Sequence, residues 1–187
     1  MKNLKDSKGF TLAEMLFCVL ILSILAALIV TGSEAVKRSL TAMEEQYAAN
    51  ALAENLLTFI TEEIRYSRDL TIETPEDTKN EAAGYRLAYK SDTYGENAVL
   101  KTDPAQEDTA YGRLILTYKD NTRKPYCPYE SLYKNLWICP LDSETPIFRW
   151  DSDGQGILVS FGICDEDGEI KASMEGIRVR LLNSPSP

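Results

Sequence analysis

The feature that most restricts the structure of this chain is an uninterrupted apolar run near its N-terminus. From Met15 to Ser33, nineteen consecutive residues carry no charge, with FCVLILSILAALIV at their centre. At about 1.5 Å per residue, such a run is long enough for a helix to cross the hydrocarbon core of a bilayer. We therefore expect a helix that is inserted in a membrane at some stage.

The charges before the apolar run predict its orientation. The first nine residues hold Lys2, Lys5 and Lys8 against Asp6 alone. Because a positively charged flank stays on the cytoplasmic side, the short N-terminal end should remain in the cytoplasm and the rest should cross the membrane. The large C-terminal part of the chain is therefore expected to be extracytoplasmic.

The residues around Gly9 distinguish this segment from a secretory signal, which is cut after its apolar core at small residues such as those near Ala26 and Ala27. Here the distinctive residues, Lys8-Gly9-Phe10-Thr11-Leu12-Ala13-Glu14-Met15-Leu16, come before the core. This stretch resembles the cleavage and methylation motif of type IV pilins and type II secretion pseudopilins, a family in which the cut follows the glycine. A permanent signal-anchor that happens to contain Gly-Phe-Thr-Leu is the alternative.

The resemblance covers about the first thirty residues and implies how the N-terminus is processed. It implies that a prepilin peptidase on the cytoplasmic side removes residues 1–9 and that the new amino group on Phe10 is methylated. The apolar helix then remains in the product and assembles with other pilin or pseudopilin subunits at an inner-membrane platform. The resemblance thus implies a single-pass cytoplasmic-membrane protein with its N-terminus inside, and later a cell-surface or periplasmic filament.

Glu14 is an acidic residue directly before the apolar core. A carboxylate in hydrocarbon costs roughly 2.5 kcal/mol or more and is seldom found there without a partner. The resemblance implies that the partner is the N-terminal amine of a neighbouring subunit, which makes Glu14 an assembly residue. The alternative is that Glu14 lies near the lipid headgroups, where its cost is small.

Beyond Gly32 the sequence keeps the character of a helix. No proline occurs before Pro75, so a helix is predicted from about Phe10 to Arg68. Thr31-Gly32-Ser33 permits local flexibility, because glycine costs a helix up to about 1 kcal/mol. Apolar residues recur in the second half at spacings of three and four, and they form one face that a sheet should cover: Ala49, Leu52, Ala53, Leu56, Leu57, Ile60 and Ile64.

After the helix the composition becomes that of a β-rich domain. Residues 71–80 are rich in Thr, Glu, Asp and Pro and are predicted to be a linker. A long helix followed by strands predicts an α+β fold with the helix packed on one face of an antiparallel sheet, which is also the pilin-like architecture. Runs rich in β-branched and aromatic residues predict the strands: 85–90, 113–119, 131–138, 157–163 and 176–182.

Four segments result from these predictions. They are a leader peptide at 1–9, a transmembrane and polymerisation helix at 10–33, the amphipathic second half of that helix at 34–70, and an extracytoplasmic β-rich globular domain at 71–187.

Two sequences that contain Asp and Gly predict turns in the globular domain. Asp167-Gly168 is a strong hairpin signal. Residues 151–154, Asp-Ser-Asp-Gly, also favour a turn. A calcium loop is the alternative for this second sequence, although its spacing matches no complete loop.

The chain contains four cysteines and no histidine. Without histidine it has no Ser-His or Cys-His catalytic pair and no Cys/His zinc site, and we expect neither enzyme activity nor a cofactor or metal. Cys127, Cys139 and Cys164 should meet an oxidising exterior, where thiols commonly pair. The short separation of Cys127 and Cys139 makes them the expected disulfide, although spacing does not establish connectivity. The alternative is that all three stay reduced and buried.

The net charge of the chain is -9, and removing the +2 leader gives -9 - 2 = -11 for the remainder. So acidic a chain lacks the phosphate-neutralising charge that binds nucleic acid. The predicted function is a structural subunit of a type IV pilus or of a type II secretion or competence pseudopilus. Residues 60–70 resemble the helix end of larger minor pilins and J-type pseudopilins, which favours a minor subunit. The alternative is a signal-anchored cell-surface ectodomain with a ligand-binding or hydrolytic role.

Overall fold

The structure is a computed structural model that describes residues 11–73, 86–91, 97–104, 112–118, 124–142 and 145–183. The chain divides into two compact units, with the boundary after Glu44. Helix α1 (Leu12–Arg65) contributes its first part to the first unit and its second part to the second. The long helix predicted from the absence of proline is confirmed, with an end three residues before the predicted Arg68.

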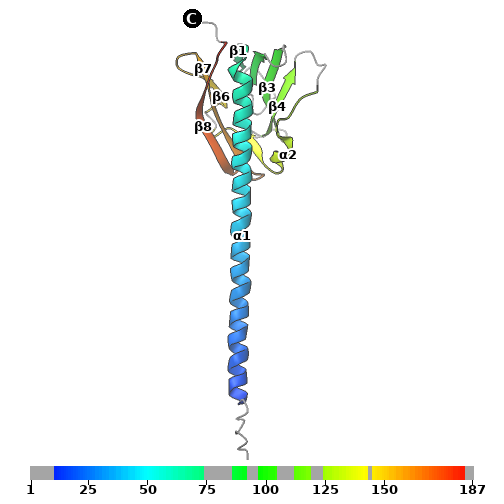
Figure 1. Ribbon diagram of the computed structural model, residues 1–187, viewed down its shortest axis with the longest axis vertical. Coiled ribbons are helices and arrows are strands. Elements are labelled where there is room, and N and C mark those ends of the chain that lie inside the picture. The colour runs from blue at the N-terminus through cyan, green and yellow to red at the C-terminus, as the bar shows by residue number, and fades with distance from the viewer. Residues whose placement is uncertain are drawn as a thin grey trace, which may run out of the picture. The chain divides into compact units, whose positions relative to one another are not determined.

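In the described residues, the first unit contains Thr11 and α1 from Leu12 to Glu44 (Figure 1). The helix continues without interruption through Thr31-Gly32-Ser33. Every residue of this part is exposed, including the large apolar ones, whose exposed fraction ranges from 49% at Leu25 to 83% at Leu12. Among the described residues of the first unit, therefore, none covers the apolar surface of the helix.

The second unit is built on one antiparallel sheet, which has eight strands in the part of the chain that the structure describes. The strands are β1 (Arg68–Glu73), β2 (Arg86–Lys90), β3 (Asn97–Pro104), β4 (Gly112–Tyr118), β5 (Trp137–Cys139), β6 (Phe148–Trp150), β7 (Gly156–Cys164) and β8 (Ile170–Arg180). Their order is β1-β2-β3-β4-β5-β7-β6, and β8 pairs separately with β7. The short helix α2 (Glu130–Tyr133) lies between β4 and β5 in the sequence.

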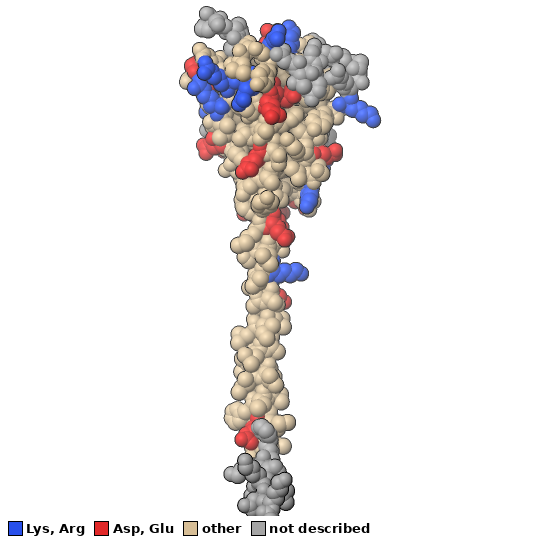
Figure 2. All heavy atoms as spheres, viewed as in Figure 1, with Lys and Arg blue, Asp and Glu red and all other residues tan. Residues whose placement is uncertain are grey.

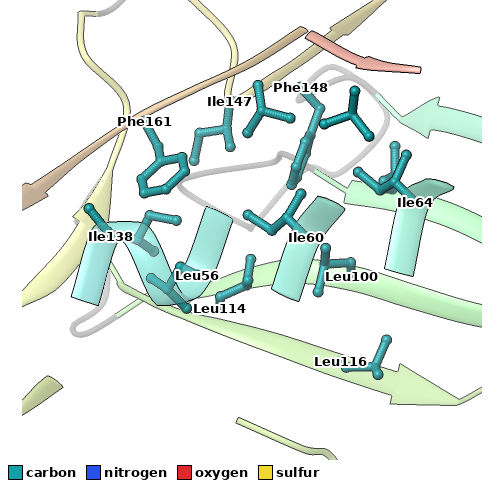
Figure 3. Packing of buried hydrophobic residues seen from close by; sticks show 14 of the residues in the cluster. Leu56, Ile60, Ile64, Leu100, Leu114, Leu116, Ile138, Ile147, Phe148 and Phe161 are labelled. Atoms are coloured by element: carbon teal, nitrogen blue, oxygen red, sulfur yellow. The ribbon is translucent and has the colours of Figure 1, made fainter. Parts of the chain in front are cut away.

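The core of the second unit lies between the second part of α1 and one face of the sheet (Figure 3). The predicted apolar face is confirmed, because all of its residues are fully buried except Leu57, which is half-buried. Strand β4 alternates buried and half-buried residues, as a strand with one face on a core should. The side chains drawn in Figure 3 come from α1, β3, β4, β5, β6, β7 and the segment that enters β6. They include Leu56, Ile60, Ile64, Leu100, Leu114, Leu116, Ile138, Ile147, Phe148 and Phe161.

Helix α1 ends at Arg65 because local hydrogen bonds and a change of backbone direction stop it there. Ser67 donates two hydrogen bonds to the carbonyl of Ile64, from its N–H at 3.0 Å and its Oγ at 2.7 Å. Asp69 adopts a left-handed φ of 49°, just after β1 has begun. The N–H of Leu182 donates to the carbonyl of Arg65 at 2.9 Å, so the C-terminal segment satisfies a helix-end acceptor.

The strand predicted over 131–138 is wrong in its first half. Residues 130–133 form α2, and the strand covers only 137–139. Tyr129 and Lys134 flank α2 with φ values of 55° and 41°, which an extended strand does not allow. The Tyr133 ring is buried and its hydroxyl accepts a 2.9 Å hydrogen bond from the N–H of Leu114, so tertiary packing overrides the strand propensity of this run.

The other predicted strands correspond to β2, β4, β7 and the second half of β8, which begins at Ile170 rather than 176. Strands β1, β3 and β6 were not predicted. The linker predicted at 71–80 is wrong at its start, because residues 71–73 belong to β1, and its remainder lies outside the described residues. Pairing with β2, rather than composition, makes this polar segment a strand.

Both predicted turns are confirmed. The loop that contains Asp167-Gly168 joins β7 to β8, with Gly168 at a φ of 80°. Asp151 to Gly154 turn β6 into β7, and the carboxylates of Asp151 and Asp153 both pair with Arg178, the first at 2.5 Å. Among the described residues no group of three or more His, Cys, Asp or Glu is arranged to hold a metal ion.

Candidate functional site

The N-terminus of α1 carries a reciprocal cap formed by Thr11 and Glu14. The Glu14 Oε2 accepts hydrogen bonds from the N–H of Thr11 at 2.9 Å and from its hydroxyl at 3.0 Å. In return, the N–H of Glu14 donates to Thr11 Oγ1 at 3.3 Å. This is a capping box, in which two backbone donors that the helix leaves unsatisfied gain partners. Its sequence signature, a threonine followed three residues later by a glutamate, is present in the chain but was not used in the prediction.

The cap directs the Glu14 carboxylate toward the start of the helix. Negative charge is favourable there, because the peptide dipoles place partial positive charge at a helix N-terminus. Glu14 is the one residue of the predicted cleavage and assembly site that the structure describes, and it lies in the first turn of α1. Gly9 and Phe10, where the cut and the methylation are expected, lie outside the described residues.

The surface that follows Glu14 is apolar over many turns. The next charged residue along the chain is Glu34, and Figure 2 shows a long uncharged stretch on the displayed face of α1. Among the described residues, α1 is the one helix that is long and apolar enough to cross a membrane, judged by length and composition. None of the apolar window is buried within the protein. Such a surface can be covered by lipid tails, by the helix of a neighbouring subunit, or first by one and then by the other.

The hydroxyl groups inside the apolar run are bonded to the helix itself. Ser23 donates to the carbonyl of Val19 at 2.7 Å, and Thr31 donates to the carbonyl of Ala27 at 3.0 Å. Ser33 donates to the carbonyl of Val30 at 2.8 Å. Such bonds remove the cost of exposing these hydroxyl groups to hydrocarbon.

The cysteines are distributed over both units. Cys18 is exposed on the apolar part of α1, whereas Cys127 is half-buried and Cys139 and Cys164 are buried in the second unit. The side chains of Cys139 and Cys164 are hydrogen-bonded to each other. Sequence spacing did not single out this neighbour, and the disulfide expected between Cys127 and Cys139 stays a prediction.

A comparison with family models identifies a prokaryotic N-terminal methylation motif at residues 4–30. The match includes Gly9, Phe10 and Glu14 and ends inside the apolar run. No curated protein and no solved structure matches the chain.

Proposed function

We propose that this chain is a structural subunit of a type IV pilus or related pseudopilus, because it carries the N-terminal methylation motif that is the hallmark of type IV pilins and pseudopilins. The long apolar helix packed, in its second part, on an antiparallel sheet is the pilin-like layout. The motif points to a family of structural subunits rather than to an enzyme family. The methylation motif is the observation on which the proposal rests.

Processing of the N-terminus is the first step of the proposed function. A prepilin peptidase cuts between Gly9 and Phe10 at the cytoplasmic face and methylates the new amine of Phe10. The basic leader is lost, and the apolar helix at 10–33 stays in the membrane as the single anchor of the subunit. The second unit then lies outside the cytoplasm.

Assembly follows from the unpartnered apolar surface of the first unit. In the membrane, lipid tails cover the exposed leucine and isoleucine side chains between Glu14 and Glu34. A subunit that leaves the bilayer must replace these contacts, because each such side chain exposed to water costs about 1.5–3 kcal/mol. The helices of neighbouring subunits supply the replacement, so other pilin or pseudopilin subunits and an inner-membrane platform are the proposed partners.

Glu14 sets the register of assembly in this proposal. A carboxylate has about four acceptor positions, so the two hydrogen bonds from Thr11 do not exhaust its capacity. A neighbour displaced along the filament brings its Phe10 ammonium opposite Glu14. In a bundle that excludes water this pair is stronger than a surface pair, and the loss of one partner leaves the other charge uncompensated.

The cap provides a control that separates assembly from helix capping. The change Glu14→Ala removes both the cap and the carboxylate, whereas Thr11→Ala removes the Thr11 hydroxyl of the cap and keeps the carboxylate. Loss of a cap costs a helix about 1 kcal/mol in either variant. We expect both chains to insert and to be cut, and only the Glu14→Ala chain to be depleted, by tenfold or more, from sheared surface filaments.

Two other results would contradict the role of Glu14. Equal depletion of the Thr11→Ala and Glu14→Ala chains would assign Glu14 to capping alone. Undiminished incorporation of both would favour a position near the lipid headgroups. Normal incorporation of a Glu34→Ala chain, which loses an exposed carboxylate of the same helix, is the matched control.

A minor subunit is the finer form of the proposal, supported by the resemblance of residues 60–70 to the helix end of larger minor pilins. A minor subunit is present at a low ratio to the major subunit, so quantitative mass spectrometry of purified filaments tests this point directly. A chain that forms the bulk of the filament would contradict it.

A further inference from the structure

Cys139 and Cys164 lie on adjacent strands and point to the same side of the sheet. In the register of β5 with β7, Cys139 is opposite Gly162 and Cys164 is opposite Trp137. The two cysteines are therefore a diagonal pair on one face of the sheet. Their sulfur groups are hydrogen-bonded.

The absence of a side chain at Gly162 provides the space that the sulfur of Cys139 occupies. A Cβ atom added at Gly162 would lie 3.1 Å from Cys139 Sγ and 3.3 Å from Cγ2 of Ile170. The sulfur thus occupies the space above Gly162, where any other residue would place a side chain. Cys139 and Cys164 are 7% and 1% exposed, so the pair is enclosed.

Cys127 lies on the other side of the sheet. It packs against the core cluster that α1 covers, whereas Cys139 and Cys164 are not members of that cluster. Their neighbours in β5 and β7, Ile138 and Ile163, do belong to it, and successive side chains of a strand point to opposite faces. The sheet therefore separates Cys127 from the pair.

We propose that Cys139 and Cys164 form a disulfide bond that ties β5 to β7 in the mature protein. This inference rests on the proposed function only for the oxidising exterior in which the bond forms. It names a different partner for Cys139 from the Cys127 that sequence spacing suggests.

The bond would reinforce the narrowest part of the sheet. Strand β5 has three residues, and its register with β4 contains one residue pair, Gly112 with Ile138. On its other side β5 pairs with β7 over three residues. A covalent link from β5 to β7 fixes the short strand that connects the β1–β4 part of the sheet to the β6–β8 part.

The reaction is a thiol–disulfide exchange with a protein or low-molecular-weight disulfide as oxidant. The Cys164 thiolate attacks the disulfide of the oxidant, forms a mixed disulfide and releases one thiolate. Cys139 then loses its proton and attacks the Cys164 sulfur, which forms the new S–S bond and releases the second thiol of the oxidant. Two electrons pass to the oxidant, and the two protons of the cysteines pass to the solvent or to the released thiolates.

The hydrogen bond between the two cysteines favours Cys164 as the first thiolate to react. It lowers the pKa of Cys164 and raises the pKa of Cys139, because the Cys139 S–H stabilises a thiolate on Cys164. Burial and the neighbouring Asp165 oppose the ionisation of Cys164. Exchange therefore occurs while β5 is still forming or transiently open.

The test uses the full chain in detergent, equilibrated with oxidised and reduced glutathione, then alkylated and digested without reduction. We expect a linked peptide pair that contains Cys139 and Cys164, and an alkylated Cys127. A link between Cys127 and either other cysteine, or alkylation of all three, would overturn the inference. The assay needs neither leader cleavage nor filaments, so its failure is distinct from a failure of the proposed function.

Thermal unfolding followed by tryptophan fluorescence provides a second test. The signal reports only the second unit, because both tryptophans, Trp137 and Trp150, lie in its sheet. Reduction should lower the Tm of the wild-type chain and of a Cys127→Ala chain by roughly 10 °C. The Tm of a Cys139→Ala/Cys164→Ala chain should not change on reduction. A shift that disappears with Cys127→Ala instead would assign the bond to Cys127.

Discussion

At the scale of single residues, Glu63 shows how α1 is held on the sheet. Its side chain interrupts the apolar face of the helix, and it is the one charged residue among the buried residues that the structure describes. The hydroxyl of Tyr89 donates a 3.0 Å hydrogen bond to Glu63 Oε2. Burial raises the pKa of the Glu63 carboxyl, while hydrogen bonds from Tyr89 and Ser91 oppose the rise.

The raised pKa predicts a defined pH dependence of stability. A carboxyl with a raised pKa holds its proton more tightly in the folded chain than in the unfolded chain. The stability that this carboxyl contributes is therefore fully present below its pKa in the unfolded chain, and it is lost as the pH rises through its pKa in the folded chain. We expect a Glu63→Gln chain to be more stable than wild type at pH 7 and equally stable at pH 4, measured by urea unfolding.

Two further variants control this experiment. A Glu54→Gln chain, which changes an exposed carboxylate of the same helix, should match wild type at both pH values. A Tyr89→Phe chain removes one of the two hydrogen-bond donors to the carboxylate, and its free energy of unfolding should fall by roughly 1.5–3 kcal/mol at pH 7 and by less at pH 4. A Glu63→Gln chain that is less stable than wild type at pH 7 would show that the ionised carboxylate is favourable.

At the scale of elements, α1 contains one residue that weakens it inside the apolar run. Gly32 is helical, and a Cβ atom placed there would have no heavy atom within 4 Å. Alanine therefore fits without a clash, and it should stabilise the helix locally by about 1 kcal/mol. With glycine at this position, local opening of the helix costs less free energy than it would with alanine.

A Gly32→Ala chain tests this point by amide hydrogen exchange in detergent. Exchange at residues 31–33 should slow by about fivefold, which corresponds to about 1 kcal/mol of local opening free energy. The reverse change in the same run, Ala27→Gly, should accelerate exchange around residue 27. Unchanged exchange in the Gly32→Ala chain would mean that the glycine does not determine where the helix opens.

The elements also show which parts of the fold are readable from the sequence. Helix α1 and its buried face were predicted because proline is absent and apolar residues recur at helical spacing over many turns. Strand β3 was missed because its second half, Lys101 to Pro104, is polar, and pairing with β2 and β4 makes it a strand. The run at 131–138 was mispredicted because its aromatic and apolar residues fit a strand equally well.

The candidate site also contains features that are local in the sequence and features that depend on strand pairing. Gly9, Phe10 and Glu14 could be proposed from the sequence because their motif is local. The Thr11 cap is equally local and was readable from the spacing of the two residues. The contact between Cys139 and Cys164 was not, because it depends on which strands become neighbours, and sheet order is set by the whole domain.

At the scale of the whole molecule, the two units need different surroundings. The second unit has a core of its own, formed by α1 from Ala49 onward and the sheet. In the part of the first unit that the structure describes, residues 11–44, the helix surface is apolar over many turns and no residue is buried. In the proposed function, lipid or other subunits cover this surface, and the N-terminal methylation motif at residues 4–30 is the observation that supports the proposal.

The position of the N-terminal cut tests this account most directly. The chain should be expressed in cells with a prepilin peptidase, and the intact membrane-bound protein analysed by mass spectrometry. We predict a chain that begins with N-methylated Phe10, and an uncut precursor when Gly9→Val is introduced. A chain that still begins at Met1 would indicate a permanent anchor, and a cut near Ala27 would indicate a secretory signal; either result would contradict the assignment to a pilin-like filament.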